Sequence, residues 1–138
     1  MNNNYIKYET YVSNETANML NHIGFDLPCR YYYIDNSNIF IDSEYESMDF
    51  TSKFIPRPSL ELVNKWLRDV KKIYIQISVV TLGYVVIIKD ISNFDRITYI
   101  SNKCNFYKSY EEALENSIKF ICNFINDKKN EKISDNTK

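Results

Sequence analysis

Glycine is scarce in this chain of 138 residues, which contains only Gly24 and Gly83. A loop that cradles phosphate groups needs several glycines close together, because its backbone amides must approach the phosphate oxygens closely. Neither glycine has another one near it in the sequence. The composition therefore argues against the Gly-rich loops of nucleotide-binding proteins.

The sequence also has few residues for metal binding or nucleophilic catalysis. His22 is the only histidine, and the three cysteines, Cys29, Cys104 and Cys122, form no C-x-x-C pair. A zinc site takes about four nitrogen or sulfur ligands at short spacings, and a catalytic thiolate needs a base or a positive charge beside it. We therefore predict no metal, no cofactor and no catalytic residue, and hence a protein that is not an enzyme. The odd, widely spaced cysteine set is typical of a reducing compartment.

Long apolar runs are missing as well. The most apolar run, residues 73–88, is interrupted by polar residues and by Gly83, and it is shorter than the ~20 residues that a membrane-spanning helix needs. Residues 1–5 lack the charged-then-apolar pattern of a secretory signal. We therefore expect a cytoplasmic protein without a membrane partner.

Charge of either sign is nearly balanced, with a formal net charge of −1. No overall field therefore attracts nucleic acid or an anionic membrane. The charge is nevertheless uneven, because residues 1–56 carry a net −5 and residues 57–89 carry a net +4. Two interpretations are open: the basic segment balances the acidic first third within one fold, or it forms a patch that binds a partner.

The most informative stretch begins at Ser59, a residue type that caps helix N-termini well. The apolar residues that follow repeat first with helical spacing and then, after residue 72, with a period of two. This change predicts an amphipathic helix that leads almost directly into a strand, and we expect the helix to cover one face of the sheet. The helical face consists of Val63, Trp66, Leu67 and Val70, and the strand face of Ile73, Ile75, Ile77 and Val79.

Two pairs of apolar runs predict β-hairpins. Residues 30–34 and 39–41 flank the segment 35–38, whose Asp, Asn and Ser residues suit a turn because Asn and Asp tolerate positive φ. Residues 73–80 and 84–90 flank a turn that contains Gly83. We expect the strand at 84–90 to be central, since it is almost continuously apolar.

Helices are predicted on either side of these hairpins. The first covers residues 13–23 and ends at Gly24, where a left-handed residue is favoured. The last starts with a capping box at Ser109 and runs to about residue 127. A shorter strand is predicted over residues 96–101.

These elements predict an α+β fold, with a mainly antiparallel sheet of about four to five strands packed against about three helices. Hairpin connections favour antiparallel pairing. We expect a single α+β domain over residues 1–127. Residues 128–138 are mostly charged and polar, and we expect them to form a frayed or disordered C-terminal tail.

One face of the predicted helix 59–72 carries positive charge. Lys65, Arg68 and Lys72 lie at i, i+3 and i+7, away from the apolar face, and Arg57 precedes the helix. In the strand 30–34, Tyr32 faces away from its two tyrosine neighbours and could stack on a ligand. These five residues are the candidate partner-binding residues. The simpler interpretation is a solvated helix face whose charges pair within the helix, and a tyrosine that favours strands.

Several short motifs occur in a characteristic combination: Ala17-x-x-Leu20-x-x-x-Gly24-Phe25, Cys29-Arg30-Tyr31-Tyr32-Tyr33, Pro58-Ser59 followed by Lys65-Trp66-Leu67-Arg68-Asp69-Val70, and Ser109-Tyr110-Glu111-Glu112-Ala113. Over residues 10–127 the chain thereby resembles a family of small uncharacterised proteins encoded by phages and mobile elements of gut anaerobes. The resemblance implies a phage or prophage origin, and thus the cytoplasm of a host cell. It implies no activity, and no functional residue carries over.

The leading hypothesis is a small phage-type accessory protein that acts by binding, with a protein as its partner. One alternative is a nucleic-acid-binding module that uses the basic helix 59–72 and the tyrosines of strand 30–34, and its affinity would fall steeply with salt. A second alternative is a minor component of the virion. The oligomeric state does not follow from the sequence.

Overall fold

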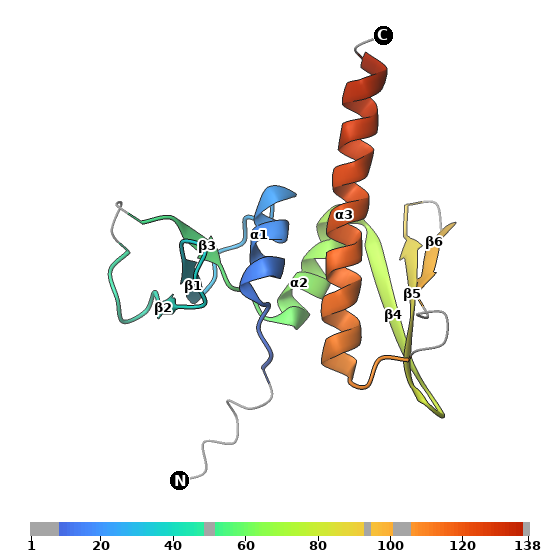
Figure 1. Cartoon of the computed structure of the whole chain (residues 1–138), viewed down its shortest axis with the longest axis horizontal. Helices are drawn as coiled ribbons and strands as arrows, with labels where there is room; N and C mark the ends of the chain where they lie inside the picture. Colours follow the sequence, from blue (N-terminus) through green and yellow to red (C-terminus); the bar gives the residue numbers. More distant parts are fainter. Residues whose placement is uncertain (1–8, 49–51, 93–94, 101–105, 137–138) are drawn as a thin grey trace. The chain divides into compact units, whose positions relative to one another are not determined.

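The computed structural model of the protein describes residues 9–48, 52–92, 95–100 and 106–136, and Figure 1 shows their secondary structure. The described residues form two compact units. Unit 1 contains residues 9–10 and the described part of 59–118, and unit 2 contains the described part of 11–58 together with 119–136. The C-terminal helix contributes its first turns to unit 1 and its remaining turns to unit 2.

Unit 2 begins with helix α1 (Asn14–His22), which has the caps that the sequence predicts. The Ser13 side chain accepts a hydrogen bond from the backbone amide of Thr16, which would otherwise lack a partner in the first helical turn. Gly24 has a φ of +97°, in the left-handed region where helices commonly end. The apolar side of α1 is buried through residues such as Leu20.

An antiparallel sheet follows in unit 2, drawn in blue-green and green in Figure 1. The predicted first hairpin is confirmed, and its turn contains Asp35 at a φ of +52°. Tyr33 pairs with Phe40 on one side and with Ile55 on the other, so these three side chains share one face of the sheet. The strands lie in the order β2-β1-β3, with β1 at Tyr31–Ile34, β2 at Phe40–Asp42 and β3 at Phe54–Pro56.

The core of unit 2 draws on α1, the sheet and the C-terminal helix. Helix α1 contacts β3. The buried Tyr33 hydroxyl donates a hydrogen bond of 2.6 Å to the carbonyl of Val12, so its polar end is satisfied inside the core. The buried apolar residues of this unit include Val12, Ala17, Leu20, Ile23, Phe25, Ile41, Ile55, Ile121 and Cys122.

Unit 1 contains a second antiparallel three-stranded sheet, in the order β4-β5-β6. The long hairpin that the sequence predicts is confirmed, with Val80 opposite Gly83 at the turn. Gly83 has a φ of +150°, and a Cβ added there would lie 2.5 Å from the backbone oxygen of Tyr107, so this position requires glycine. The strands are β4 (Ile73–Val80), β5 (Gly83–Asp90) and β6 (Asp95–Ile100).

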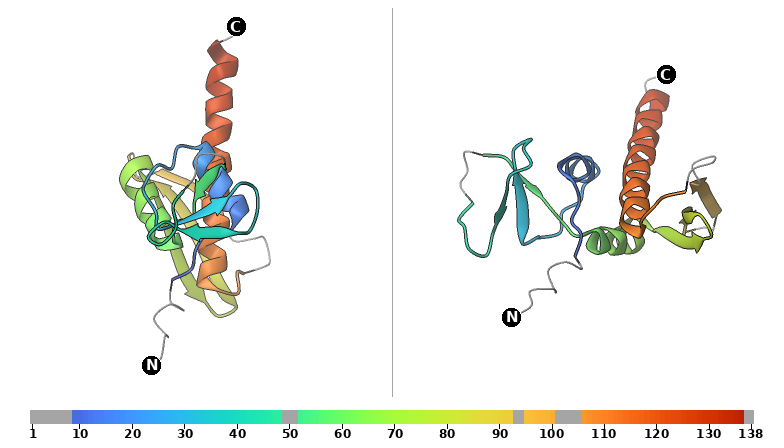
Figure 2. Two further views of the ribbon diagram at one scale, coloured as in Figure 1. Left: turned by 90° about the vertical axis from the view of Figure 1, so that its left-hand side faces the viewer. Right: turned by 60° about the horizontal axis from the view of Figure 1, so that its bottom comes forward.

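Helix α3 (Tyr110–Asn136) starts beside this hairpin, as both views of Figure 2 show. Tyr107, just before the helix, exchanges backbone hydrogen bonds of 2.9 and 3.1 Å with Tyr84 on β5. The predicted capping box is also present. Ser109 Oγ accepts from the amide of Glu112 at 3.1 Å, and the Glu112 carboxylate accepts from the amide just before Ser109. These bonds fix the first turn of α3 to the second sheet.

The helix that follows Ser59 changes type along its length. It starts as the α-helix α2 (Leu60–Trp66) and continues as the π-helix η2 (Leu67–Lys71). The amide of Lys72 bonds to the carbonyl of Leu67, five residues back, and Lys72 itself has a φ of +59°, which ends the helix. A π-helical turn holds more residues than an α-helical turn, so side chains after Trp66 fall behind the α-helical phase.

This change of phase alters which residues are buried. Val63, Trp66 and Leu67 are buried, as predicted, whereas Val70 is 57% exposed. The prediction that Val70 belongs to the buried face is therefore wrong, because it assumed a uniform α-helical period. The strand periodicity resumes at Ile73, which is buried again.

The same substitution at two positions of this helix tests the phase change. We expect Val63→Ala to lower the free energy of unfolding by about 2 kcal/mol, because it removes two fully buried methyl groups. We expect Val70→Ala to change it by less than about 0.5 kcal/mol, because that side chain is already in contact with solvent. Urea unfolding followed by the fluorescence of Trp66 measures both. Equal losses for the two variants would show that Val70 is part of the core.

The α+β class and the antiparallel pairing are confirmed, but the strands are arranged differently from the prediction. The described strands form two sheets of three strands each, and not one sheet of about four to five. The cause lies in the segment after β3. Pro56 and Pro58 remove backbone donors, and α2 starts at Leu60, so the next strand begins in the other unit. The prediction of a single domain over residues 1–127 stays a prediction.

Helix α3 continues to Asn136, past the predicted end near residue 127. Residues 128–136 contain neither proline nor glycine and include lysine and glutamate, which favour helices. The sequence predicts a frayed or disordered tail for residues 128–138 because it lacks an apolar face to pack. The structure has helix at 128–136, where intrinsic propensity is enough to extend a helix already formed.

Candidate functional site

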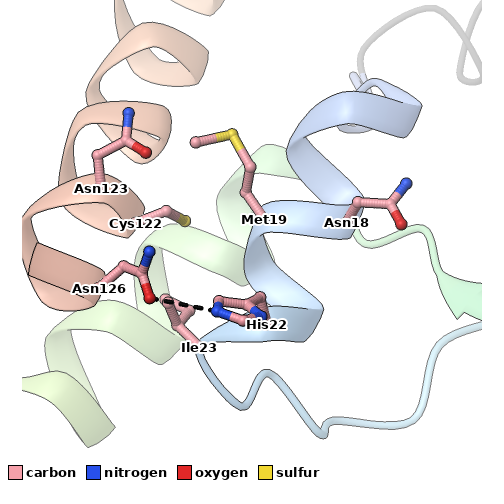
Figure 3. A pocket seen from close by; sticks show the side chains of 7 residues that line it. All are labelled: Asn18, Met19, His22, Ile23, Cys122, Asn123 and Asn126. Atoms are coloured by element: carbon pink, nitrogen blue, oxygen red, sulfur yellow. Dashed lines mark hydrogen bonds between the residues drawn. The ribbon is translucent and has the colours of Figure 1, made fainter. Parts of the chain in front are cut away.

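A cavity of about 250 Å³ lies between α1 and α3 within unit 2, and Figure 3 shows its walls. Most of its polar groups are side-chain amides. Asn126 on α3 and His22 on α1 approach each other across it, with 3.2 Å between Asn126 Oδ1 and His22 Nε2. The lining residues are Asn18, Met19, His22, Ile23, Cys122, Asn123 and Asn126.

Cys122 is the only lining residue that could act as a strong nucleophile, but its surroundings keep it neutral. The side chain is buried, and burial raises the pKa of its thiol to about 12. A catalytic cysteine requires the opposite, a pKa lowered by an adjacent base or positive charge. The parts of the chain that the structure describes contain no group of three His, Cys, Asp or Glu side chains placed to hold a metal ion. The cavity therefore offers hydrogen-bonding side chains and no activated thiol.

Thiol labelling tests this account of Cys122. We expect iodoacetamide at about pH 8 to leave Cys122 unmodified in the folded protein, because only the thiolate reacts and its pKa lies near 12. Peptide mass spectrometry separates the three cysteines. Labelling of Cys122 in urea is the control, and labelling of the folded protein at the rate of a free thiol would contradict the account.

The raised pKa of Cys122 also makes the stability of the fold depend on pH. Its contribution is fully present below pH 9.0, the usual pKa of a thiol, and it is lost as the pH rises toward 12.

Unit 2 also contains a cluster of two arginines among aromatic rings, which we call the aromatic–arginine cluster. The ring of Tyr31 meets the rings of Tyr11 and Phe40 edge to face, with centroids 5.2 and 5.8 Å away. The cluster joins the segment before α1, the first hairpin and the end of β3. Its members are Tyr11, Arg30, Tyr31, Tyr33, Phe40, Tyr45 and Arg57.

Strand pairing places Arg57 inside this cluster. The amide of Arg57 donates a 3.0 Å hydrogen bond to the carbonyl of Tyr31, which extends the pairing of β1 with β3 by one residue. Directly opposed residues of an antiparallel pair lie on one face. The Arg57 guanidinium carbon is 3.9 Å from the ring centre of Phe40 and 4.5 Å from that of Tyr11. Both distances are within the range of cation–π attraction.

Arg30 occupies a different electrostatic environment. Its Nε and Nη2 atoms donate to the Asp42 carboxylate at 2.9–3.0 Å, and Nε lies 3.3 Å from Glu44. The hydrogen bond from Arg30 holds the pKa of the Asp42 carboxyl below its usual value. Asp42 at the end of β2 and Glu44 just after it thus neutralise Arg30, and they form no ion pair with Arg57 within the described chain.

Large apolar side chains are exposed next to the aromatic–arginine cluster. Ile39 is 67% exposed, Phe40 is 45% exposed, and Tyr45 in the following turn is 76% exposed. Met48 is also exposed. Of these residues, Phe40 and Tyr45 lie beside the arginines, and aromatic and arginine side chains are enriched in protein interfaces. This surface and the cluster both belong to unit 2.

One of the three basic side chains predicted on helix 59–72 forms an ion pair within the helix. Lys65 Nζ lies 2.6 Å from Asp69, four residues on. The hydrogen bond from Lys65 lowers the pKa of Asp69, and the charges of Arg68 and Lys72 act in the same direction. The Asp69 carboxylate therefore lies near the three basic side chains and reduces the positive electrostatic potential that they create together.

The five predicted partner-binding residues divide between the two units. Lys65, Arg68 and Lys72 belong to unit 1, whereas Arg57 and Tyr32 belong to unit 2. Tyr32 lies on the sheet face opposite to Arg57, and its hydroxyl accepts a hydrogen bond from the amide of Cys29 at 3.2 Å. Cys104, the remaining cysteine, lies outside the described residues.

Sequence reasoning missed the partners of Arg57. Tyr11, Phe40 and Arg57 come from three separate segments, and only the strand register brings them together. One signal was available, because Tyr31 and Tyr33 were predicted to share a face of a strand. The register of that strand with residues 54–57 could not be read from the sequence.

Comparison with known proteins finds no relative. No protein-family model, curated protein or solved structure matches this chain. Among the described helices, none combines the length and the apolar character needed to cross a membrane. The functional argument therefore depends on the chemistry of the described residues.

Proposed function

We propose that the protein acts by binding a protein partner through the aromatic–arginine cluster and the apolar side chains beside it. The observation that carries this proposal is the exposure of Phe40 next to Arg57 and of Tyr45 next to Arg30. Aromatic residues, methionine and arginine are the residue types enriched in protein–protein interfaces, and they supply most of the binding energy there.

The exposed side chains can supply substantial binding energy. Removing one Ile or Phe side chain from water contributes about 1.5–3 kcal/mol. Phe40 is also held in place in the free protein by Arg57 and by the ring of Tyr31. A side chain that is already ordered loses little conformational entropy on binding, so more of the burial energy is available for affinity.

Nucleic acid fits this surface less well. Residues 11–58 carry three basic side chains against seven acidic ones, a net charge of −4. A phosphate backbone binds mainly through several unpaired basic residues, and Arg30 is already paired with Asp42. The other basic region, on helix 59–72, includes the Lys65–Asp69 pair.

The broader role depends on the sequence alone. A phage-type accessory protein in a host cytoplasm is consistent with the family resemblance and with the odd cysteine count. A minor virion component would use the same kind of surface, with a capsid or tail protein as the partner. These roles stay predictions, and the binding proposal does not depend on which of them applies.

Two matched substitutions test the proposal. Affinity capture from the producing cells, with quantitative mass spectrometry, compares the wild-type protein with Phe40→Ser and Leu82→Ser. Leu82 is the control, since it is 75% exposed but lies in the β4–β5 turn of unit 1. We expect a partner that is retained by Leu82→Ser and reduced roughly 30-fold by Phe40→Ser, the loss typical of an interface hot spot. Equal capture by all three proteins, or no partner for the wild type, would contradict it.

A further inference from the structure

The Arg57 guanidinium lies among aromatic rings, and the ring centres of Phe40 and Tyr11 are 3.9 and 4.5 Å from its carbon. Aromatic contacts of this kind use the electron-rich faces of the rings. They give the N–H groups at the edge of the guanidinium plane no oxygen acceptor.

No described acceptor takes up that edge. Arg57 Nε is buried and has no hydrogen-bond partner, and no described carboxylate forms an ion pair with this arginine. Arg30, in the same cluster, differs in this respect, because its N–H groups pair with the carboxylates of Asp42 and Glu44. A cation without an acceptor for its N–H groups is costly to hold in a partly buried position, and an incoming carboxylate would lower that cost.

The planar edge of a guanidinium fits a carboxylate or a phosphate through two parallel hydrogen bonds. The surroundings favour a single carboxylate over a polyanion, because residues 11–58 carry a net charge of −4 and would repel a chain of phosphates. The Phe40 ring beside Arg57 is apolar and 45% exposed. It offers contact to an apolar side chain next to the acid.

We propose that the partner contributes a linear segment in which an aspartate or glutamate lies beside an apolar residue, and that Arg57 binds the acidic side chain. This inference rests on the proposed function and adds the chemistry of the partner. Of the Arg57 nitrogens, only Nε is both buried and without a partner, so the carboxylate can approach the two Nη atoms while the Phe40 ring stays over the guanidinium. The apolar neighbour of the acid then packs against the exposed part of that ring.

Selection from a library of random linear peptides tests the inference on the full chain. We expect the enriched peptides to share an acidic residue next to an apolar one. Titration calorimetry then compares a selected peptide with its amide version, in which Asp becomes Asn or Glu becomes Gln. We expect the amide version to bind wild-type protein roughly 10- to 100-fold more weakly, as for the loss of a charge-assisted hydrogen bond.

A double-mutant cycle assigns the effect to Arg57. In Arg57→Gln the acidic and amide peptides are expected to bind equally, because the partner of the carboxylate is gone. Arg57→Lys keeps the cation without the planar fork, and we expect it to lose at least part of the preference for the acid. Arg68→Gln, in the other unit, is the matched control and is expected to keep the full preference.

Three results would overturn the inference. The first is a set of selected peptides without a shared acid, and the second is an acid-to-amide effect of equal size in wild type and Arg57→Gln. The third is binding of a mixed-sequence oligonucleotide that depends on Arg57. If peptide binding is weakened by substitution of Phe40 but not by loss of the acid or of Arg57, this inference is refuted and the proposed function stands. If substitution of Phe40 does not weaken peptide binding either, both are refuted.

Discussion

The contact of one arginine with several aromatic rings organises unit 2. Tyr11 precedes α1, Phe40 lies on β2 and Arg57 follows β3, so a single guanidinium connects three segments that are distant in sequence. Backbone hydrogen bonds support the same junction, since the amide of Arg57 bonds to Tyr31 and the amide of Val12 bonds to Pro58. Aromatic rings stabilise the cation here, and no described carboxylate pairs with it.

The two arginines of the cluster illustrate how local charge decides what a cation can do. Arg30 lies beside Asp42 and Glu44, which neutralise it and hold the turn after β2. Arg57 directly follows β3, lies over aromatic rings and forms no ion pair with a described carboxylate. The first arginine therefore contributes to structure. In our proposal the second binds an acidic side chain of the partner, and the exposed Phe40 ring contacts the residue beside that acid.

Much of the fold was predictable because it depends on local chemistry. Ser13, Ser59 and Ser109 cap the helices as expected, and the change of period after residue 72 marks the start of β4. Val70 was not predictable, because a π-helix keeps an α-helical sequence pattern while shifting the phase. The division into two sheets and the partners of Arg57 depend on contacts between distant segments, which periodicity does not encode.

The central claim is that the Arg57 guanidinium lies against the faces of Phe40 and Tyr11. The side-chain Nε–H resonance of Arg57 in an NMR spectrum tests it most directly, because protons above an aromatic face are shifted upfield. We expect the Arg57 signal upfield of the Arg30 signal, whose guanidinium is 5.4 Å or more from its rings, and we expect Phe40→Leu to remove most of this difference. An Arg57 signal at the position of a solvated arginine, unchanged by Phe40→Leu, would contradict the account.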